Sequence, residues 1–136
     1  MTKIITFDGH DGVGKTTLIS YLNRKFAEES ISASAVRVLD DQFNSFRSQN
    51  PQEQKNIWLY ISSWLDAERR IDSLRPQNEI VLVDRSYLST YVLAKTFDIP
   101  FPDFILDRFL KPDLAIQVVV KEEERIQRIQ RDLMAN

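Results

Sequence analysis

The sequence of 136 residues contains no cysteine, a single histidine and only three glycines. The lack of cysteine excludes disulfides, thiolate nucleophiles and cysteine-ligated metals, and it favours a reducing, cytoplasmic location. No apolar run approaches the length that crosses a membrane, and we expect no signal peptide, because only a short apolar run follows Lys3. Basic residues are not in excess either. The net charge of −2 and isoelectric point of about 5.4 argue against a general nucleic-acid binder, but they allow a local basic pocket for one small anion.

Strand and helix patterns alternate along what we expect to be one domain, residues 1–136. The clearest strand is EIVLVD, whose unbroken apolar run is typical of a strand covered on both faces in a parallel sheet. We expect strands at 3–8, 33–39, 79–84 and 113–120, helices at 15–29, 50–74, 87–95 and from 121 onward, and a short helix near 104–110. Asn50 is expected to cap the second helix, after a polar loop, with Pro51 at its first position. This order predicts an α/β fold with a parallel sheet.

All three glycines lie between the first expected strand and the first expected helix. Residues 9–16, GHDGVGKT, fit the phosphate-loop pattern G-x-x-x-x-G-K-(S/T) in the strand–loop–helix context that it requires. Glycine lets backbone N–H groups surround a polyphosphate, and the following helix directs its partial positive charge at the same point. Lys15 is expected to reach the β- and γ-phosphates of ATP or GTP, and the Thr16 hydroxyl to bind Mg²⁺. The residues expected to bind the donor here are Gly9, His10, Asp11, Gly12, Val13, Gly14, Lys15, Thr16 and Thr17.

A second polar group ends the clearest strand, in VDRSYLST at residues 83–90. Ligands collect at the carboxyl ends of parallel strands, so Asp84 is expected near the loop, where its carboxylate can hold Mg²⁺ or its water. Arg85 can clamp a phosphate through two hydrogen bonds. The plainer alternative is an Asp84–Arg85 ion pair that only ends the strand. The sequence has no N-K-x-D, and no D-x-x-G follows the second strand, which argues against a GTP switch.

Three segments together resemble the thymidylate kinases. They are FDGHDGVGKTTL, VDRSYLST and KPDLAIQVVVKEEERIQRIQRD, and they occur in the family's order over nearly the whole chain. The resemblance implies a three-layer α/β/α P-loop fold of the nucleoside-monophosphate-kinase type. It also implies transfer of a phosphoryl group from ATP, with Mg²⁺, to dTMP or a related nucleoside monophosphate. Two alternatives stay open: a deoxynucleoside kinase, and a non-catalytic P-loop protein.

The resemblance also implies roles for matching positions. Asp11 would lie near the acceptor sugar, Arg85 would hold the acceptor phosphate, and Asp84 would work with Mg²⁺. Together with Lys15 these residues form the expected catalytic set. Tyr60 falls where the family places a phenylalanine that stacks on thymine, although an inward-facing aromatic residue is as often part of the core.

For several charged residues, two interpretations of their role stay open. Asp40 or Asp41 can supply a carboxylate to the acceptor, and one of them would be the general base if that acceptor is a nucleoside. Arg128 matches an arginine on the helix that leads into the family's lid, where it would contact the donor. A solvated helix face explains Arg128, and equally Arg125 and Arg131.

The sequence departs from the family around the acceptor. The second strand ends in VRVLDDQFN, where thymidylate kinases carry R-E-P-G. Trp64 replaces an arginine that helps to hold the acceptor phosphate, and Arg69 or Arg70 could compensate only in part. Leu93 and Ala94 replace a Y-Q pair near the thymine. The donor site is therefore better supported than dTMP as the acceptor.

The family continues past Asp132 with an arginine-bearing lid and a fifth strand, whereas this sequence ends at Asn136. An arginine on the transferring phosphoryl group is worth about 10³–10⁵ in rate. We therefore expect either a fragment of a longer kinase or a shortened relative with weak or no turnover. By resemblance alone, a homodimer is expected through the apolar face at 57–65 and the helix after Arg85.

Overall fold

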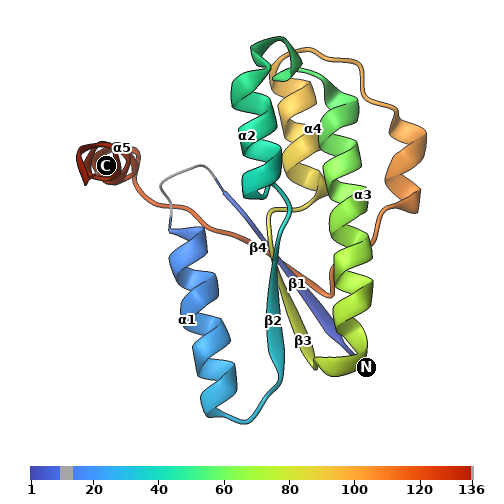
Figure 1. Cartoon of the computed structure of the whole chain (residues 1–136), viewed down its shortest axis with the longest axis vertical. Coiled ribbons are helices and arrows are strands. Elements are labelled where there is room, and N and C mark those ends of the chain that lie inside the picture. Colours follow the sequence, from blue (N-terminus) through green and yellow to red (C-terminus); the bar gives the residue numbers. More distant parts are fainter. Residues whose placement is uncertain (10–13, 136) are drawn as a thin grey trace.

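A computed structural model of the chain describes residues 1–9 and 14–135. The described residues form one parallel sheet of four strands in the order β2-β3-β1-β4 (Figure 1). The strands are β1 (Lys3–Asp8), β2 (Ala33–Arg37), β3 (Ile80–Asp84) and β4 (Leu114–Gln117). β1 and β3 occupy the centre and pair in register from Lys3 opposite Ile80 to Phe7 opposite Asp84. The predicted parallel α/β fold is confirmed.

Helices cover both faces of this sheet. The α-helices are α1 (Lys15–Glu28), α2 (Asp41–Gln49), α3 (Ile57–Leu74), α4 (Tyr87–Thr96) and α5 (Glu122–Ala135), and short 3₁₀ helices span Pro51–Glu53, Arg75–Gln77 and Asp103–Arg108. Figure 1 shows α1 on one side of the sheet and α2, α3 and α4 grouped on the other. The result is the expected three-layer arrangement.

Alternation along β1 explains the two cores. Ile4 points to the layer of α3 and α4, where it packs in a cluster with Ile61 and Trp64. Phe7 points to the opposite face and packs with Ile19 of α1. On β3 the residues Val81, Leu82 and Val83 are all fully buried, because both faces of this central strand are covered.

The segment between β2 and α3 corrects the sequence prediction. Residues 41–49, expected as a polar loop, form α2, because the Asp40 carboxylate accepts a hydrogen bond from the Phe43 N–H at 2.9 Å and caps the helix. The next long helix begins at Ile57 instead of near Asn50, and Asn56 caps it by accepting from the Trp58 N–H at 3.1 Å. Pro51 begins only a 3₁₀ turn.

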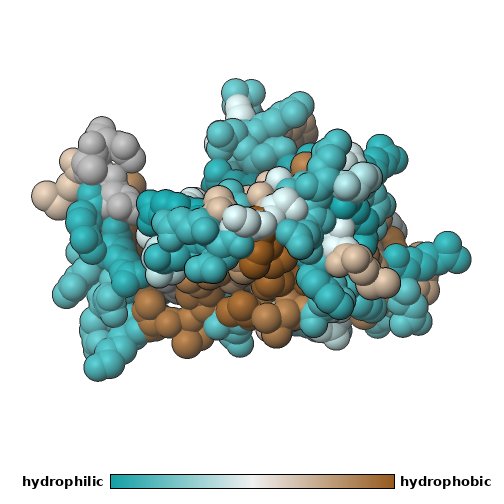
Figure 2. Space-filling view, turned by 90° about the horizontal axis from the view of Figure 1, so that it is seen from below, coloured by the Kyte–Doolittle hydropathy of each residue, from teal (hydrophilic) through white to brown (hydrophobic). Residues whose placement is uncertain are grey.

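β4 is shorter than the expected strand at 113–120 and forms one edge of the sheet. Its Leu114 is 52% exposed, and Val119 beyond its end is 73% exposed. Figure 2, which views the molecule from below, shows hydrophobic side chains gathered along one side of the otherwise polar surface. Among the described residues, no helix has both the length and the apolar character needed to cross a bilayer.

The corrected start of α3 can be tested by removing its cap. We expect Asn56→Ala to lower the free energy of unfolding by about 1 kcal/mol, because the Trp58 N–H loses its acceptor, and Asn56→Asp to keep most of the stability. Urea denaturation measures both. A larger loss for Asn50→Ala than for Asn56→Ala would contradict the boundary that the structure shows.

Candidate active site at the carboxyl edge of the sheet

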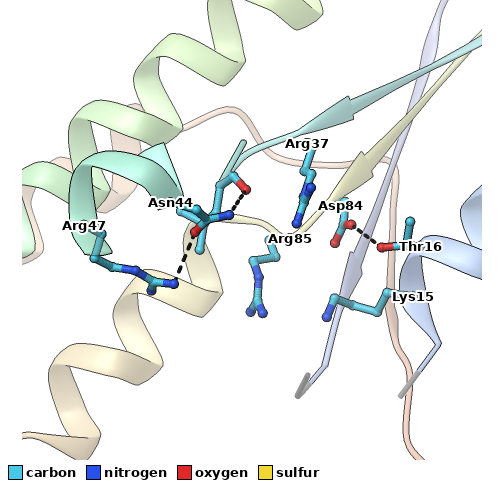
Figure 3. A pocket seen from close by; sticks show the side chains of 8 residues that line it. Lys15, Thr16, Arg37, Asn44, Arg47, Asp84 and Arg85 are labelled. Carbon is cyan, nitrogen blue, oxygen red and sulfur yellow. Dashed lines mark hydrogen bonds between the residues drawn. The ribbon is translucent and has the colours of Figure 1, made fainter. Parts of the chain in front are cut away.

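The ends of β2 and β3, the start of α1 and one side of α2 surround a cavity of about 350 Å³ (Figure 3). It is lined by Lys15, Thr16, Arg37, Leu39, Asn44, Arg47, Asp84 and Arg85. Four of these side chains are cationic, whereas Asp84 is the single anion and Leu39 the single apolar residue among them. A cavity with this lining concentrates positive potential and suits an anionic ligand.

The start of α1 forms one end of the cavity. Lys15, its first residue, is buried, and its Nζ donates to the Gly9 carbonyl oxygen at 3.1 Å. The N-cap position is Gly14, which has no side chain, and the first turn of the helix contains no acidic residue. Its N–H groups and partial positive charge are therefore available to an anion, as a phosphate site requires.

The backbone conformation at position 14 requires glycine. Its φ of +90° lies in the left-handed region that favours glycine, and an added Cβ would meet the Arg128 Nη1 atom at 3.0 Å. Arg128 thus brings its guanidinium from α5 to the start of α1, while its Nη2 donates to Glu124 at 2.7 Å. The expected donor-binding arginine therefore lies beside Gly14, at the end of the phosphate loop.

Thr16 and Asp84 meet beside Lys15. The Thr16 hydroxyl donates to the Asp84 Oδ2 atom at 3.3 Å, across the gap between α1 and β3. Asp84 is 9% exposed and lines the cavity with Thr16. A hydroxyl and a carboxylate oxygen at this spacing are the hard ligands that Mg²⁺ prefers, and Mg²⁺ in such sites takes its remaining ligands from water and substrate phosphates. The two residues therefore fit the metal that the sequence predicts.

Arg85 follows Asp84 in a strained backbone conformation. Its φ is +80°, and its N–H donates to the Phe7 carbonyl oxygen at 2.8 Å. For a residue other than glycine this conformation costs about 1–3 kcal/mol, and it persists where the surrounding structure fixes it. Figure 3 shows the Arg85 side chain extending toward the cavity beside that of Lys15.

The other side of the cavity comes from β2 and α2. Arg37 lies at the end of β2, and Asn44 and Arg47 lie one turn apart on α2. Arg47 donates to the Asn44 Oδ1 atom at 3.2 Å, and Asn44 donates to the Leu39 carbonyl oxygen at 3.0 Å. These bonds orient Arg47, whose guanidinium also lies 5.8 Å from the centre of the Phe43 ring.

Arg37, Asn44 and Arg47 were not predicted as site residues. With residues 41–49 expected as a loop, the three-residue spacing from Asn44 to Arg47 carried no meaning. One signal could have revealed this helix: Asp40 is a residue that often caps helices, and the apolar Phe43 follows it three positions later.

Tyr60 and Trp64 belong to the protein core. Tyr60 is 6% exposed, donates from its hydroxyl to the Gln54 carbonyl oxygen at 2.8 Å, and packs edge-on against Phe43 at 5.2 Å. Trp64 is 1% exposed and packs against the rings of Tyr87 and Phe109. Neither side chain lines the cavity, and the stacking role of Tyr60 stays a prediction.

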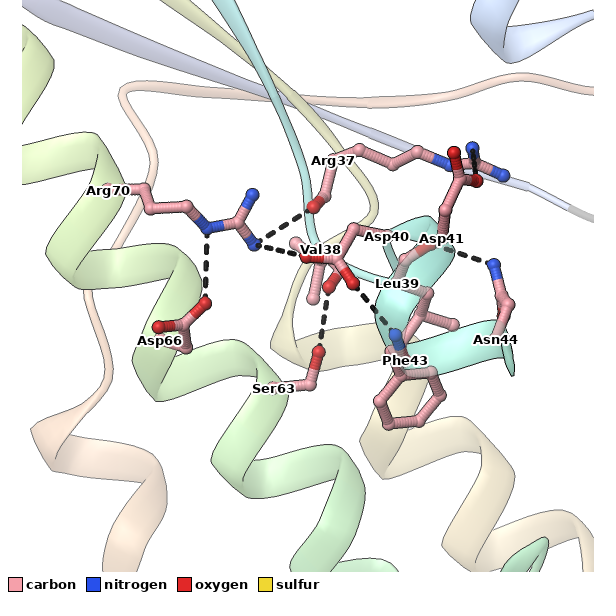
Figure 4. A network of polar contacts seen from close by, with 10 residues as sticks. All are labelled: Arg37, Val38, Leu39, Asp40, Asp41, Phe43, Asn44, Ser63, Asp66 and Arg70. Atoms are coloured by element: carbon pink, nitrogen blue, oxygen red, sulfur yellow. Dashed lines mark hydrogen bonds and ion pairs between the residues drawn. The ribbon is translucent and has the colours of Figure 1, made fainter. Parts of the chain in front are cut away.

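The aspartates after β2 and the arginine Arg70 form a connected support for the loop (Figure 4). Asp40 caps α2 and lies 4.0 Å from Arg70, and Asp41 pairs with Arg37 at 3.2 Å with its side chain almost fully exposed. Arg70 bonds to Asp66 at 3.2 Å and to the Arg37 carbonyl oxygen at 3.0 Å. Arg70 therefore stabilises the end of β2 instead of entering the cavity in place of the arginine lost at position 64.

The remaining expected positions are spread more widely. Thr17 is exposed on α1 and does not line the cavity, and Arg69 and Arg131 are exposed on their helices. Arg125 pairs with Glu122 at 2.6 Å on α5. Leu93 is half-buried and Ala94 fully buried in α4. The expected donor and acceptor contacts of His10, Asp11, Gly12 and Val13 lie outside the described residues.

A strand, a glycine-containing loop and a helix that begins with Lys15-Thr16, together with Asp84-Arg85 at the end of the adjacent strand, define a P-loop nucleotide kinase. The family model for thymidylate kinases matches residues 7–135. A curated relative, "Probable thymidylate kinase" from Sulfurisphaera tokodaii, is 29% identical over 97% of this chain and 71% of its own length. The chain belongs to the thymidylate kinase family, and its chemistry is phosphoryl transfer to a nucleotide.

A solved structure agrees on the fold. The crystal structure of thymidylate kinase from Ehrlichia chaffeensis matches with a TM-score of 0.64 at 22% identity, over 98% of this chain and 80% of that chain. At this level of identity the match supports the architecture alone.

The conformation of Gly14 leads to a direct test. We expect Gly14→Ala to lower the free energy of unfolding by about 1–2 kcal/mol, because alanine is strained at positive φ. Urea denaturation of Gly14→Ala in the wild-type and Arg128→Ala backgrounds separates strain from the Arg128 contact. An unchanged stability in both backgrounds would contradict the described loop end.

Proposed function

We propose that the chain transfers the γ-phosphoryl group of ATP to a nucleoside monophosphate, with dTMP as the first candidate. The observation that carries this proposal is the charge distribution of a single cavity. Lys15, Thr16 and Asp84 form an end suited to the donor phosphates, Arg37 and Arg47 line the side that comes from β2 and α2, and Arg85 extends toward the cavity beside Lys15. Phosphoryl transfer depends mainly on positioning and on stabilising negative charge, which this lining supplies.

In the proposed reaction the donor lies along the phosphate loop. The α1 N-terminus and Lys15 hold its β- and γ-phosphates, and Arg128 approaches the same point from α5. Thr16 and Asp84 would hold Mg²⁺, which, when bound, neutralises charge on the transferring group. Membership of the family supports ATP as the donor and Mg²⁺ as its partner.

The acceptor side favours a monophosphate over a nucleoside. A nucleoside hydroxyl needs a carboxylate to take its proton, whereas an acceptor phosphate oxygen is already ionised and needs only cations. The Asp40 carboxylate is occupied in capping α2, and Asp41 is paired with Arg37 at the surface. Three arginines line the cavity instead, so the deoxynucleoside kinase alternative has less support.

Arg37 and Arg47 take the place of the arginine that is absent at position 64. Trp64 is fully packed among aromatic rings and cannot contribute charge. Arg47 reaches the cavity from α2, and Arg37 from the end of β2, the strand that neighbours β3, which Arg85 follows. We infer that this chain holds the acceptor phosphate from the β2–α2 side.

An assay with ATP, Mg²⁺ and a panel of nucleosides and nucleoside monophosphates tests the reaction. We expect ADP and a nucleoside diphosphate to form with dTMP, and Lys15→Ala to lower kcat by about 10²-fold or more, as the loss of a preorganised charge does in other sites. Lys25→Ala, on the exposed side of the same helix, is the matched control and should retain activity. Saturable ATP binding without turnover on any acceptor would support the non-catalytic alternative.

The proposed acceptor arginines make a separate prediction. We expect Arg47→Ala to raise KM for dTMP by about 10-fold or more while KM for ATP changes little, because one charge-assisted hydrogen bond to the acceptor is lost. Arg75→Ala serves as control, since Arg75 pairs with Asp72 at the far end of α3 and does not line the cavity. Steady-state kinetics with each substrate varied in turn measures the difference. Equal effects of Arg47→Ala on both KM values would argue against an acceptor role.

A further inference from the structure

Asp8, the last residue of β1, receives three hydrogen bonds from the start of α4. The Ser86 N–H donates to its Oδ1 atom at 3.0 Å, and the Ser86 hydroxyl to its Oδ2 atom at 2.7 Å. The Ser89 hydroxyl donates to Oδ1 at 2.6 Å. Short O–H···O contacts of this kind are the stronger, charge-assisted type. Asp8 does not line the cavity, so its carboxylate faces α4 instead of the proposed ligands.

These bonds surround the strained residue Arg85. Its own N–H donates to the Phe7 carbonyl oxygen at 2.8 Å, and the next N–H, that of Ser86, is held by Asp8. Both consecutive amides are thus fixed to the end of β1, on either side of a φ of +80°. Ser86 in turn caps α4, because its hydroxyl oxygen accepts from the Leu88 N–H at 3.1 Å. One carboxylate therefore determines both the start of the helix and the peptide that follows Arg85.

Two aspartates end neighbouring strands, and their surroundings separate their roles. Asp84 lines the cavity and accepts from the Thr16 hydroxyl, which leaves it suited to a metal. Asp8 accepts from three protein donors that fix its orientation away from the cavity. The Asp8 carboxylate is thus a structural group at the end of the strand next to the one that Asp84 and Arg85 end.

We propose that Asp8 is a positioning residue that directs the Arg85 guanidinium into the cavity. By anchoring the Arg85–Ser86 peptide, its carboxylate holds Arg85 in a backbone conformation that an arginine does not keep by itself. This inference rests on the proposed function, in which Arg85 holds the acceptor phosphate. Asp8 also directly precedes Gly9, whose carbonyl oxygen accepts from Lys15, so one residue connects the donor loop with the acceptor arginine.

The test compares Asp8→Asn with two other variants. Ser89→Ala removes one of the three bonds from α4 without touching the phosphate loop. Asp113→Asn is the matched control, because its carboxylate accepts from the Ile4 N–H at 2.8 Å near the opposite end of β1. We expect Asp8→Asn to raise KM for dTMP by about 10-fold, Ser89→Ala by less, and Asp113→Asn to lower thermal stability without changing KM.

A double mutant identifies the residue through which Asp8 acts. Arg85→Gly removes the guanidinium, and glycine adopts the same φ without strain. In that background we expect Asp8→Asn to add less than about twofold to KM for dTMP, because coupled residues are not additive. Full additivity, or an equal change of KM in Asp8→Asn and Asp113→Asn, would overturn the inference.

Amide hydrogen exchange tests the anchoring by Asp8 without requiring catalytic activity. We expect Asp8→Asn to speed exchange of the Ser86 N–H by about 10-fold relative to the wild type, since that bond is weakened, while Asp113→Asn leaves it unchanged. If the wild type phosphorylates no monophosphate, the proposed function fails, and faster exchange at Ser86 still supports the positioning role. Unchanged exchange at Ser86 in Asp8→Asn would overturn the inference whatever the activity.

Discussion

The parallel pairing of β1 with β3 is the constraint on which the rest of the structure depends. Phe7 lies opposite Asp84, so the phosphate loop after β1 and the Asp84-Arg85 pair after β3 emerge at the same edge of the sheet. A slip of one residue would turn Asp84 to the opposite face and separate it from Thr16. The buried apolar residues of β3 specify this register, because both faces of the strand are covered.

Charge is the second determinant of the site. Four cationic side chains converge on the cavity with one carboxylate among the lining residues, and the N-terminus of α1 adds its own partial positive charge. Like charges at close range repel, so the arrangement is stabilised by neighbouring acceptors such as the Asn44 amide and the Gly9 carbonyl oxygen. A phosphate-bearing ligand would relieve the same repulsion, so a cavity with this lining is suited to an anion.

The fold was largely predictable from sequence, and the proposed donor half of the site more so than the proposed acceptor half. The apolar runs at β1 and β3 and the motif ending in Lys15-Thr16 are local signals, and the structure brings Lys15, Thr16, Asp84 and Arg85 together as expected. The proposed acceptor half depends on α2, a short polar helix whose apolar side chains are Phe43 and Phe46 alone. The helix depends on the cap that Asp40 provides and on packing against α3, where the Tyr60 ring contacts Phe43. Tyr60 is distant from α2 in sequence.

The support of the β2–α2 loop shows why those contacts were not predictable. The Ser63 hydroxyl donates to the Val38 carbonyl oxygen at 2.7 Å, and Arg70 bonds to the Arg37 carbonyl oxygen at 3.0 Å. Both bonds cross more than 20 residues of chain, and neither side chain belongs to a recognisable motif. Tertiary packing therefore places Arg37 and Arg47 in the cavity. Trp64, which stands where the family carries an arginine, is buried in the core instead.

The most direct test of the account asks whether one cavity holds both nucleotides. A pentaphosphate that joins adenosine to thymidine spans the two proposed ends, and calorimetric titration measures its binding. We predict that one molecule binds per chain, and that Lys15→Ala and Arg47→Ala each lower the affinity. Binding that Lys15→Ala weakens while Arg47→Ala leaves unchanged would contradict the shared cavity and with it the proposed transfer.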